Sequence, residues 1–118
     1  MSEVLESLDN VIAERRRSSD GESSYVASLC QKGLDAVLKK VAEESGETLI
    51  AAKEAQHGGE LAAVVRETAD LWFHSLVMLS VLGLRSGDVI AELEKRFGLS
   101  GIAEKAARHA ESNSTRGA

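Results

Sequence analysis

Five acidic residues at helical spacing carry the clearest chemical signal in this chain of 118 residues. They form two groups, Glu43, Glu44 and Glu47, followed by Glu67 and Asp70. Residues three and four positions apart share one face of an α-helix, so each group predicts an acidic helix face. Like charges stacked in this way repel by about 0.2–0.5 kcal/mol per pair. Because hard divalent cations prefer carboxylate oxygens, the two groups predict a site for Mg²⁺, with Mn²⁺ as the alternative metal.

Each acidic group also has a plain structural interpretation. Acids at this spacing on an alanine-rich helix are often only a solvated face, and for the first group alone this interpretation is as good as a metal site. Glu67 and Asp70 favour the metal site over a solvated face, because they precede the apolar segment 71–83 in a helix expected to be buried. His74 lies on the same face as Asp70. We interpret it as a hydrogen-bonded histidine of the core or seam rather than as a metal ligand.

Lys40 adds a positive charge to the first acidic face, since it lies about 60° from Glu43 around the helix. It could reach a phosphate there, or it could simply pair with Glu43 or Glu44. A cation held by carboxylates can bridge phosphate oxygens, and a carboxylate outside the coordination shell can take the proton of a water. The pattern therefore indicates phosphoryl or nucleotidyl transfer.

Helices must position these residues, because proline is absent and helix-forming residues dominate the chain. We predict an all-α fold, a small MazG-like bundle of four to five helices. The expected helices are 4–17, 25–32, 34–56, 60–82 and 87–97, with a last one from 98–101 to 110. Ser24 is a candidate cap for the second helix, and Gly58 and Gly59 are expected to end the third. Antiparallel helices joined there bring the two acidic faces across one seam.

Size and charge limit the domains and partners of the chain. We expect one domain over residues 1–110 and a disordered tail at 111–118. The apolar second half of the helix at 60–82 needs cover on nearly all sides, which predicts a homodimer. A net charge of −5 disfavours broad nucleic-acid binding, and segment 71–83 is too short to span a membrane. With the single Cys30 and no recognisable signal peptide, we expect a cytoplasmic protein.

Further motifs surround the acids. The five acids match Glu-Glu-x-x-Glu followed by Glu-x-x-Asp, the metal signature of the MazG-like nucleotide pyrophosphohydrolases. Around them stand a Ser-Tyr segment ending in Leu, a Lys-Gly joint, Lys-Lys-Val and Ala-Asp-Leu-x-x-His. These are Ser24, Tyr25 and Leu29, then Lys32 and Gly33, then Lys39, Lys40 and Val41, and finally Ala69, Asp70, Leu71 and His74. Over residues 24–96 the chain thereby resembles the phosphoribosyl-ATP pyrophosphatases of histidine biosynthesis.

This resemblance implies magnesium-dependent hydrolysis of the α,β phosphoanhydride of 1-(5-phosphoribosyl)-ATP to 1-(5-phosphoribosyl)-AMP and pyrophosphate. The implied metal ligands are Glu44, Glu47, Glu67 and Asp70. Glu43 is implied as a further ligand or as the residue that orients water, and which acid acts as the base stays open. The implied catalytic residues are Glu43, Glu44 and Lys40, and the implied substrate contacts are Ser24, Tyr25, Lys32, Lys39 and Lys40. A packed aromatic is an equally good interpretation of Tyr25.

Two other functions fit the same acids. A MazG-like pyrophosphohydrolase of ordinary or damaged nucleoside triphosphates would use the same metal site with a different base pocket. A non-catalytic helical dimerisation module would carry the acids only as a solvated groove and would show no magnesium-dependent activity. The motifs at 24–33 and 69–74 favour the histidine-pathway nucleotide as the small-molecule partner.

Overall fold

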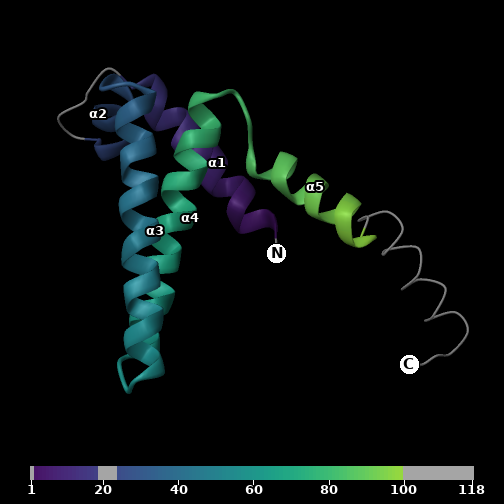
Figure 1. Cartoon of the computed structure of the whole chain (residues 1–118). Helices are drawn as coiled ribbons and strands as arrows, with labels where there is room; N and C mark the ends of the chain where they lie inside the picture. The colour runs from purple at the N-terminus through teal and green to yellow at the C-terminus, as the bar shows by residue number, and fades with distance from the viewer. Residues whose placement is uncertain (1, 19–23, 100–118) are drawn as a thin grey trace, which may run out of the picture. The chain divides into compact units, whose positions relative to one another are not determined.

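The computed structural model of this chain describes residues 2–18 and 24–99, which form five α-helices and, within those ranges, no strand (Figure 1). The helices are α1 (Ser2–Arg17), α2 (Tyr25–Gln31), α3 (Leu34–Gln56), α4 (Leu61–Val81) and α5 (Ser86–Phe97). The all-α prediction is confirmed, and α3 has the predicted bounds. The last predicted helix, from 98–101 to 110, lies outside the described residues from residue 100 on. The predicted tail at 111–118 lies outside them as well.

The chain divides after Arg85 into two compact units, residues 1–85 and 86–118. The first unit contains α1 to α4, and the described part of the second contains α5. Along α5, Val89, Leu93 and Phe97 recur at four-residue intervals and give the helix one apolar face. The single domain expected over residues 1–110 stays a prediction. No helix in the described ranges is both long enough and apolar enough to cross a membrane.

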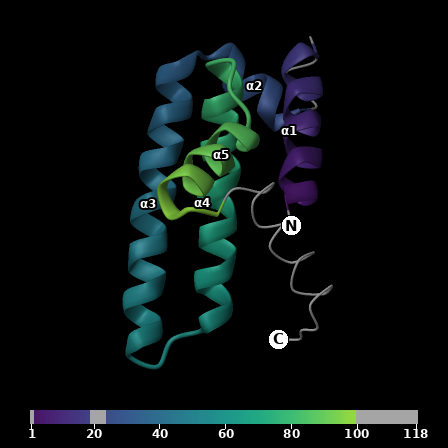
Figure 2. The same cartoon turned by 90° about the vertical axis from the view of Figure 1, so that its right-hand side faces the viewer.

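α3 and α4 form an antiparallel hairpin whose two helices lie side by side in both views (Figures 1 and 2). The turn between them requires glycine for two reasons. Gly58 has a φ of +96°, which residues with a side chain rarely adopt. At Gly59, a Cβ would lie only 2.7 Å from the backbone oxygen of Glu54. The predicted end of the long helix at these glycines is therefore confirmed.

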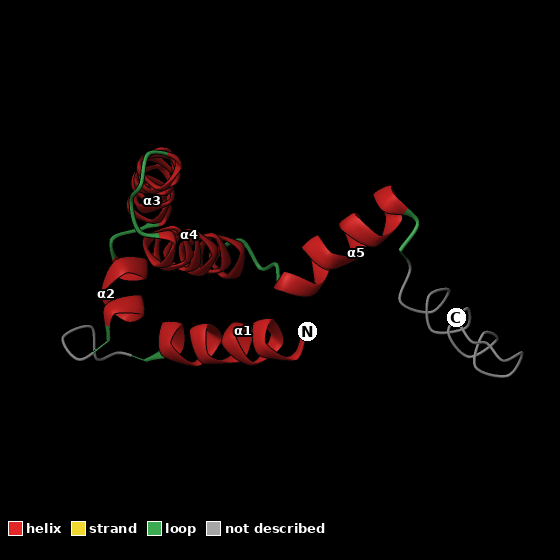
Figure 3. Cartoon of the chain, turned by 90° about the horizontal axis from the view of Figure 1, so that it is seen from below, coloured by secondary structure: helices red, strands yellow, loops and turns green. Residues whose placement is uncertain are grey.

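An apolar core closes the end of the hairpin that lies far from this turn. α1 and α2 pack there, and α4 lies between α3 and α1 when the hairpin is viewed along its length (Figure 3). The buried core residues are Ile12, Val26, Leu29, Val37, Leu76 and Val77. Arg16 of α1 also donates a hydrogen bond to the backbone oxygen of Ser80, at 2.8 Å. Beyond α1 and α2 the hairpin continues toward its turn as two helices (Figure 2).

The second half of α4 is less covered within this unit than its composition predicted. Leu76 and Val77 are buried, but Trp72 of α4 and Leu82, the residue directly after the helix, are 58% and 54% exposed. The reason is geometric, since α3 contacts α4 extensively along one side and α1 contacts it much less. Among residues 2–85 as described, the remaining face has no covering element. The homodimer expected to provide that cover stays a prediction.

Candidate metal centre

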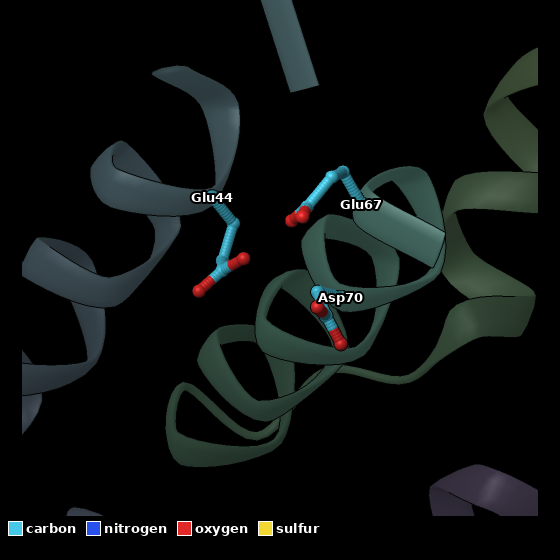
Figure 4. A group of neighbouring side chains, drawn as sticks. All are labelled: Glu44, Glu67 and Asp70. Atoms are coloured by element: carbon cyan, nitrogen blue, oxygen red, sulfur yellow. The ribbon is translucent and has the colours of Figure 1, made fainter. Parts of the chain in front are cut away.

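Three carboxylates meet at the seam between α3 and α4. Glu44 of α3 and both Glu67 and Asp70 of α4 each offer one oxygen, and these three oxygens lie within 4.8 Å of one another. The side chains of Glu44 and Glu67 point toward each other across the seam (Figure 4). Glu44 is buried, Glu67 is half-buried and Asp70 is exposed. The sequence-based expectation that both α4 acids are buried is therefore wrong for Asp70, because the described unit leaves that side of α4 open.

Two of these carboxylates have an oxygen without a hydrogen-bond partner among the described residues. Glu44 Oε1 and Glu67 Oε1 are shielded from solvent, and neither has a hydrogen-bond partner among the described residues. Burial raises the pKa of Glu67, and the negative charges of Glu47, Asp70 and Glu44 raise it further. A shielded carboxylate oxygen without a partner is costly. A divalent cation would supply both the missing charge and the missing contacts, so these donors fit Mg²⁺ or Mn²⁺.

Lys40 is paired with two of the acids. Its Nζ lies 3.2 Å from Oε1 of Glu43 and 3.5 Å from Oε2 of Glu44. The hydrogen bond to Glu43 raises the pKa of Lys40, so this amine is positively charged at neutral pH. Glu43 itself is exposed and is not one of the three converging carboxylates. Of the two interpretations of Lys40, the ion pair is present, and contact with a phosphate stays a prediction.

The other predicted ligands and phosphate contacts lie on the surface. Glu47 is exposed and outside the group of three oxygens, although its charge is close enough to raise the pKa of Glu67. Lys32 and Lys39 are exposed, and the structure gives neither an ion pair within the described ranges. Their predicted roles toward a metal and a substrate stay predictions.

The beginning of α2 contacts the acid-bearing helix through Tyr25. The Tyr25 hydroxyl lies 2.8 Å from Nε2 of His74, and Nδ1 of His74 lies 2.8 Å from the backbone oxygen of Asp70. Because a carbonyl oxygen can only accept, Nδ1 of His74 donates to Asp70, and in the tautomer with its proton on Nδ1 the Nε2 atom accepts from the Tyr25 hydroxyl. Burial raises the pKa of Tyr25, which keeps its hydroxyl protonated. His74 is thus the hydrogen-bonded seam histidine that the sequence indicated.

Tyr25 and Ser24 also have structural tasks. The Tyr25 ring stacks on Phe73, with ring centroids 6.4 Å apart, so the packed-aromatic interpretation holds. The Ser24 hydroxyl accepts the backbone N–H of Ala27 at 3.1 Å, which confirms the predicted helix cap. Contact of either residue with a substrate stays a prediction.

Sequence reasoning did not single out Thr48. Its hydroxyl lies 2.7 Å from the backbone oxygen of Glu44 and 3.1 Å from that of Glu67. One available signal was its position four residues after Glu44, which places it on the same helix face. The partner on α4 had no comparable signal, because it depends on how the two helices align.

Residues 5–97 match the model of the family described as Phosphoribosyl-ATP pyrophosphohydrolase. The chain belongs to this family. The predictions of a hydrolase acting on a phosphoanhydride, and of a place in histidine biosynthesis, are thereby confirmed. The match begins in α1 and ends at the last residue of α5, so it includes the whole carboxylate centre. Dependence on a divalent metal is typical of the family and agrees with these donors.

Glu67→Gln is expected to stabilise the metal-free protein at neutral pH. The raised pKa means that the fold disfavours the ionised side chain, and glutamine removes the charge at similar size. The gain is full above the folded-state pKa. It disappears as the pH falls below the ordinary value of 4.5, where the carboxyl group is protonated in both folded and unfolded chains.

Urea unfolding in EDTA at about pH 7 and about pH 4 measures this difference. Glu54→Gln, at an exposed position of α3, is the matched control and should change stability little at either pH. A gain from Glu67→Gln that is equally large at both pH values, or a loss at neutral pH, would contradict the interpretation.

Proposed function

We propose that this protein hydrolyses the α,β phosphoanhydride of 1-(5-phosphoribosyl)-ATP in a magnesium-dependent reaction that releases 1-(5-phosphoribosyl)-AMP and pyrophosphate. The observation that carries the proposal is the convergence of Glu44, Glu67 and Asp70 inside the family match. Mn²⁺ is the alternative metal for the same donors. The free thiol of Cys30 is compatible with the reducing cytoplasm in which we expect the reaction to occur.

Glu44, Glu67 and Asp70 would hold the cation, and Glu47 would complete the set from the exposed side of α3. When bound, the cation neutralises charge on phosphate oxygens and makes a coordinated water more acidic. The partnerless oxygens of Glu44 and Glu67 support this assignment, since they lack any other compensation among the described residues.

Lys40 and Glu43 are suited to the substrate side of the centre. Lys40 is charged and half-buried beside Glu44, where it can meet a phosphate oxygen. Glu43 is exposed and outside the three-carboxylate group, so it is the acid we assign to orient the attacking water and take its proton. In the reaction the water oxygen bonds to the α-phosphorus, the bond from this phosphorus to the α,β-bridging oxygen breaks, and pyrophosphate leaves.

The remaining predicted contacts come from α2 with its two caps and from the first half of α3. Lys32 and Lys39 carry exposed positive charges for the phosphates of a polyanionic nucleotide. Tyr25 is 52% exposed, so part of its ring is available to a substrate although its hydroxyl is committed to His74. Ser24 caps the same short helix and would face the substrate beside Tyr25.

The proposed reaction is tested by pyrophosphate release from phosphoribosyl-ATP with and without Mg²⁺. We expect turnover only with the metal, and a higher kcat/KM for phosphoribosyl-ATP than for dCTP, dUTP or ATP. A preference for a simple triphosphate would instead favour the MazG-like alternative. Absence of hydrolysis with every nucleotide would favour the non-catalytic module.

Glu44→Gln and Asp70→Asn should each lower kcat/KM at least about 100-fold, because each removes a charge that compensates the metal at the phosphates. Both changes keep the size of the side chain. Glu54→Gln, on the same helix as Glu44 but outside the centre, should retain nearly full activity. Circular dichroism verifies that the variants are folded, and unchanged turnover in both would reject the metal centre.

We also propose that two copies associate through α4. Leu61, Val65 and Trp72 share one face of this helix and are 75%, 69% and 58% exposed. Val65 and Trp72 also line a groove of about 310 Å³, together with Val64, Thr68 and Ala69. A hairpin of two helices cannot cover this face by itself, and a second copy would complete a four-helix arrangement there.

Val65→Asp should therefore shift the protein from dimer to monomer in sedimentation velocity, because it places a charge in the centre of the apolar face. Trp72, the only tryptophan of the chain, should show a red shift of its fluorescence as it becomes solvated. Ser7→Asp, at an exposed position of α1, is the control and should leave the dimer intact. A monomeric wild type, or a dimer that tolerates Val65→Asp, would contradict the proposed interface.

A further inference from the structure

We propose that Thr48 is a positioning residue for the carboxylate centre, because its hydroxyl bridges the two helices that carry the acids. The inference rests on the proposed function, in which Glu44 and Glu67 hold the cation. Oγ1 of Thr48 lies 2.7 Å from the backbone oxygen of Glu44 and 3.1 Å from the backbone oxygen of Glu67. Both acceptors thus belong to residues whose carboxylates converge at the seam.

Other hydroxyl groups of the chain show what is particular about this contact. A hydroxyl often bonds to the backbone oxygen four residues earlier in its own helix. Ser45, Thr68 and Ser75 do so at 2.9, 2.7 and 2.8 Å. None of these three has an acceptor on a second helix within the described part of the chain. Thr48 makes the same bond and, in addition, reaches from α3 to α4.

The hydroxyl has one proton to share between two carbonyl groups. Each of those carbonyls lies in the interior of its helix, so the Thr48 contact adds to the regular helical hydrogen bonds. What the hydroxyl contributes is a polar link between the two backbones at the helix turns from which the Glu44 and Glu67 side chains extend. The link opposes the repulsion between these two carboxylates, each of which keeps one shielded oxygen without a partner among the described residues.

Thr48 should therefore affect metal affinity more than it affects folding. If the two backbones are held at their spacing before the metal arrives, less of the binding free energy is used to bring the ligands together. Without the hydroxyl, both carbonyls keep their helical partners, so the fold has little to lose. The side chain touches neither the cation nor the substrate in this account and acts only through Glu44 and Glu67.

The experiment measures Mn²⁺ binding to the metal-free protein from the loss of the electron paramagnetic resonance signal of aqueous Mn²⁺. Thr48→Val keeps the shape of the side chain and removes the hydroxyl, and it should weaken binding about 10-fold. Thr48→Ser retains the hydroxyl and should bind within about 2-fold of the wild type, since the same bridge can form. Thr48→Ala, which cannot introduce a clash, is measured beside Thr48→Val so that loss of the hydroxyl is tested even if valine disturbs the packing.

Ser75→Ala is the matched control for Thr48→Ala, because it removes a hydroxyl that bonds only within α4, and it should bind Mn²⁺ like the wild type. The proposal is overturned if the variants without the hydroxyl bind normally, if Thr48→Ser binds as weakly as they do, or if Ser75→Ala weakens binding equally. A wild type that binds Mn²⁺ but does not hydrolyse phosphoribosyl-ATP would refute the proposed reaction and leave the Thr48 result to stand separately. A wild type without Mn²⁺ binding would overturn both.

Discussion

Like charges approach one another at the α3–α4 seam because the two helices are held together on either side of it. At one end, far from the turn, α1 and α2 contribute to an apolar core that holds the beginning of α3 against the end of α4. At the other end, the turn at Gly58 and Gly59 reverses the chain in so little space that a Cβ on Gly59 would meet the backbone. Between these ends small side chains such as the buried Ala51 allow the helices close contact. The carboxylates therefore converge as a consequence of forces that act elsewhere in the hairpin.

The charges at the seam are only partly balanced by the protein. Lys40 pairs with Glu43 and Glu44 on one side, while Glu44 and Glu67 each retain a shielded oxygen without a partner among the described residues. An anionic nucleotide would add further negative charge to this region. A divalent cation resolves both problems at once, since it binds carboxylates and phosphate oxygens with the same preference. The imbalance is thus a property of the fold that suits a phosphoanhydride substrate.

Much of this arrangement could be predicted from sequence because it is local. Helical periodicity fixed the faces of Glu44, Glu67 and Asp70, and cap and turn chemistry located the helix ends near Ser24 and Gly58. Three outcomes depended instead on packing between helices: the separation of Glu43 from the converging oxygens, the exposure of Asp70, and the links made by Thr48 and Tyr25. Such features follow from the alignment of one helix against another, which no spacing within a single helix specifies.

The unequal cover of the hairpin has a consequence for its motions. Local opening requires little free energy where few apolar groups are buried and much where a core must be disrupted. Within the described unit, protection of backbone amides against hydrogen exchange should therefore rise from the turn at Gly58 toward Val37 and Val77 in the core. The carboxylates lie between these two regions, at the border between the well-protected and the weakly protected part of the hairpin. A cation bound by these carboxylates would connect α3 to α4 at this point and extend the rigid part of the hairpin toward the turn.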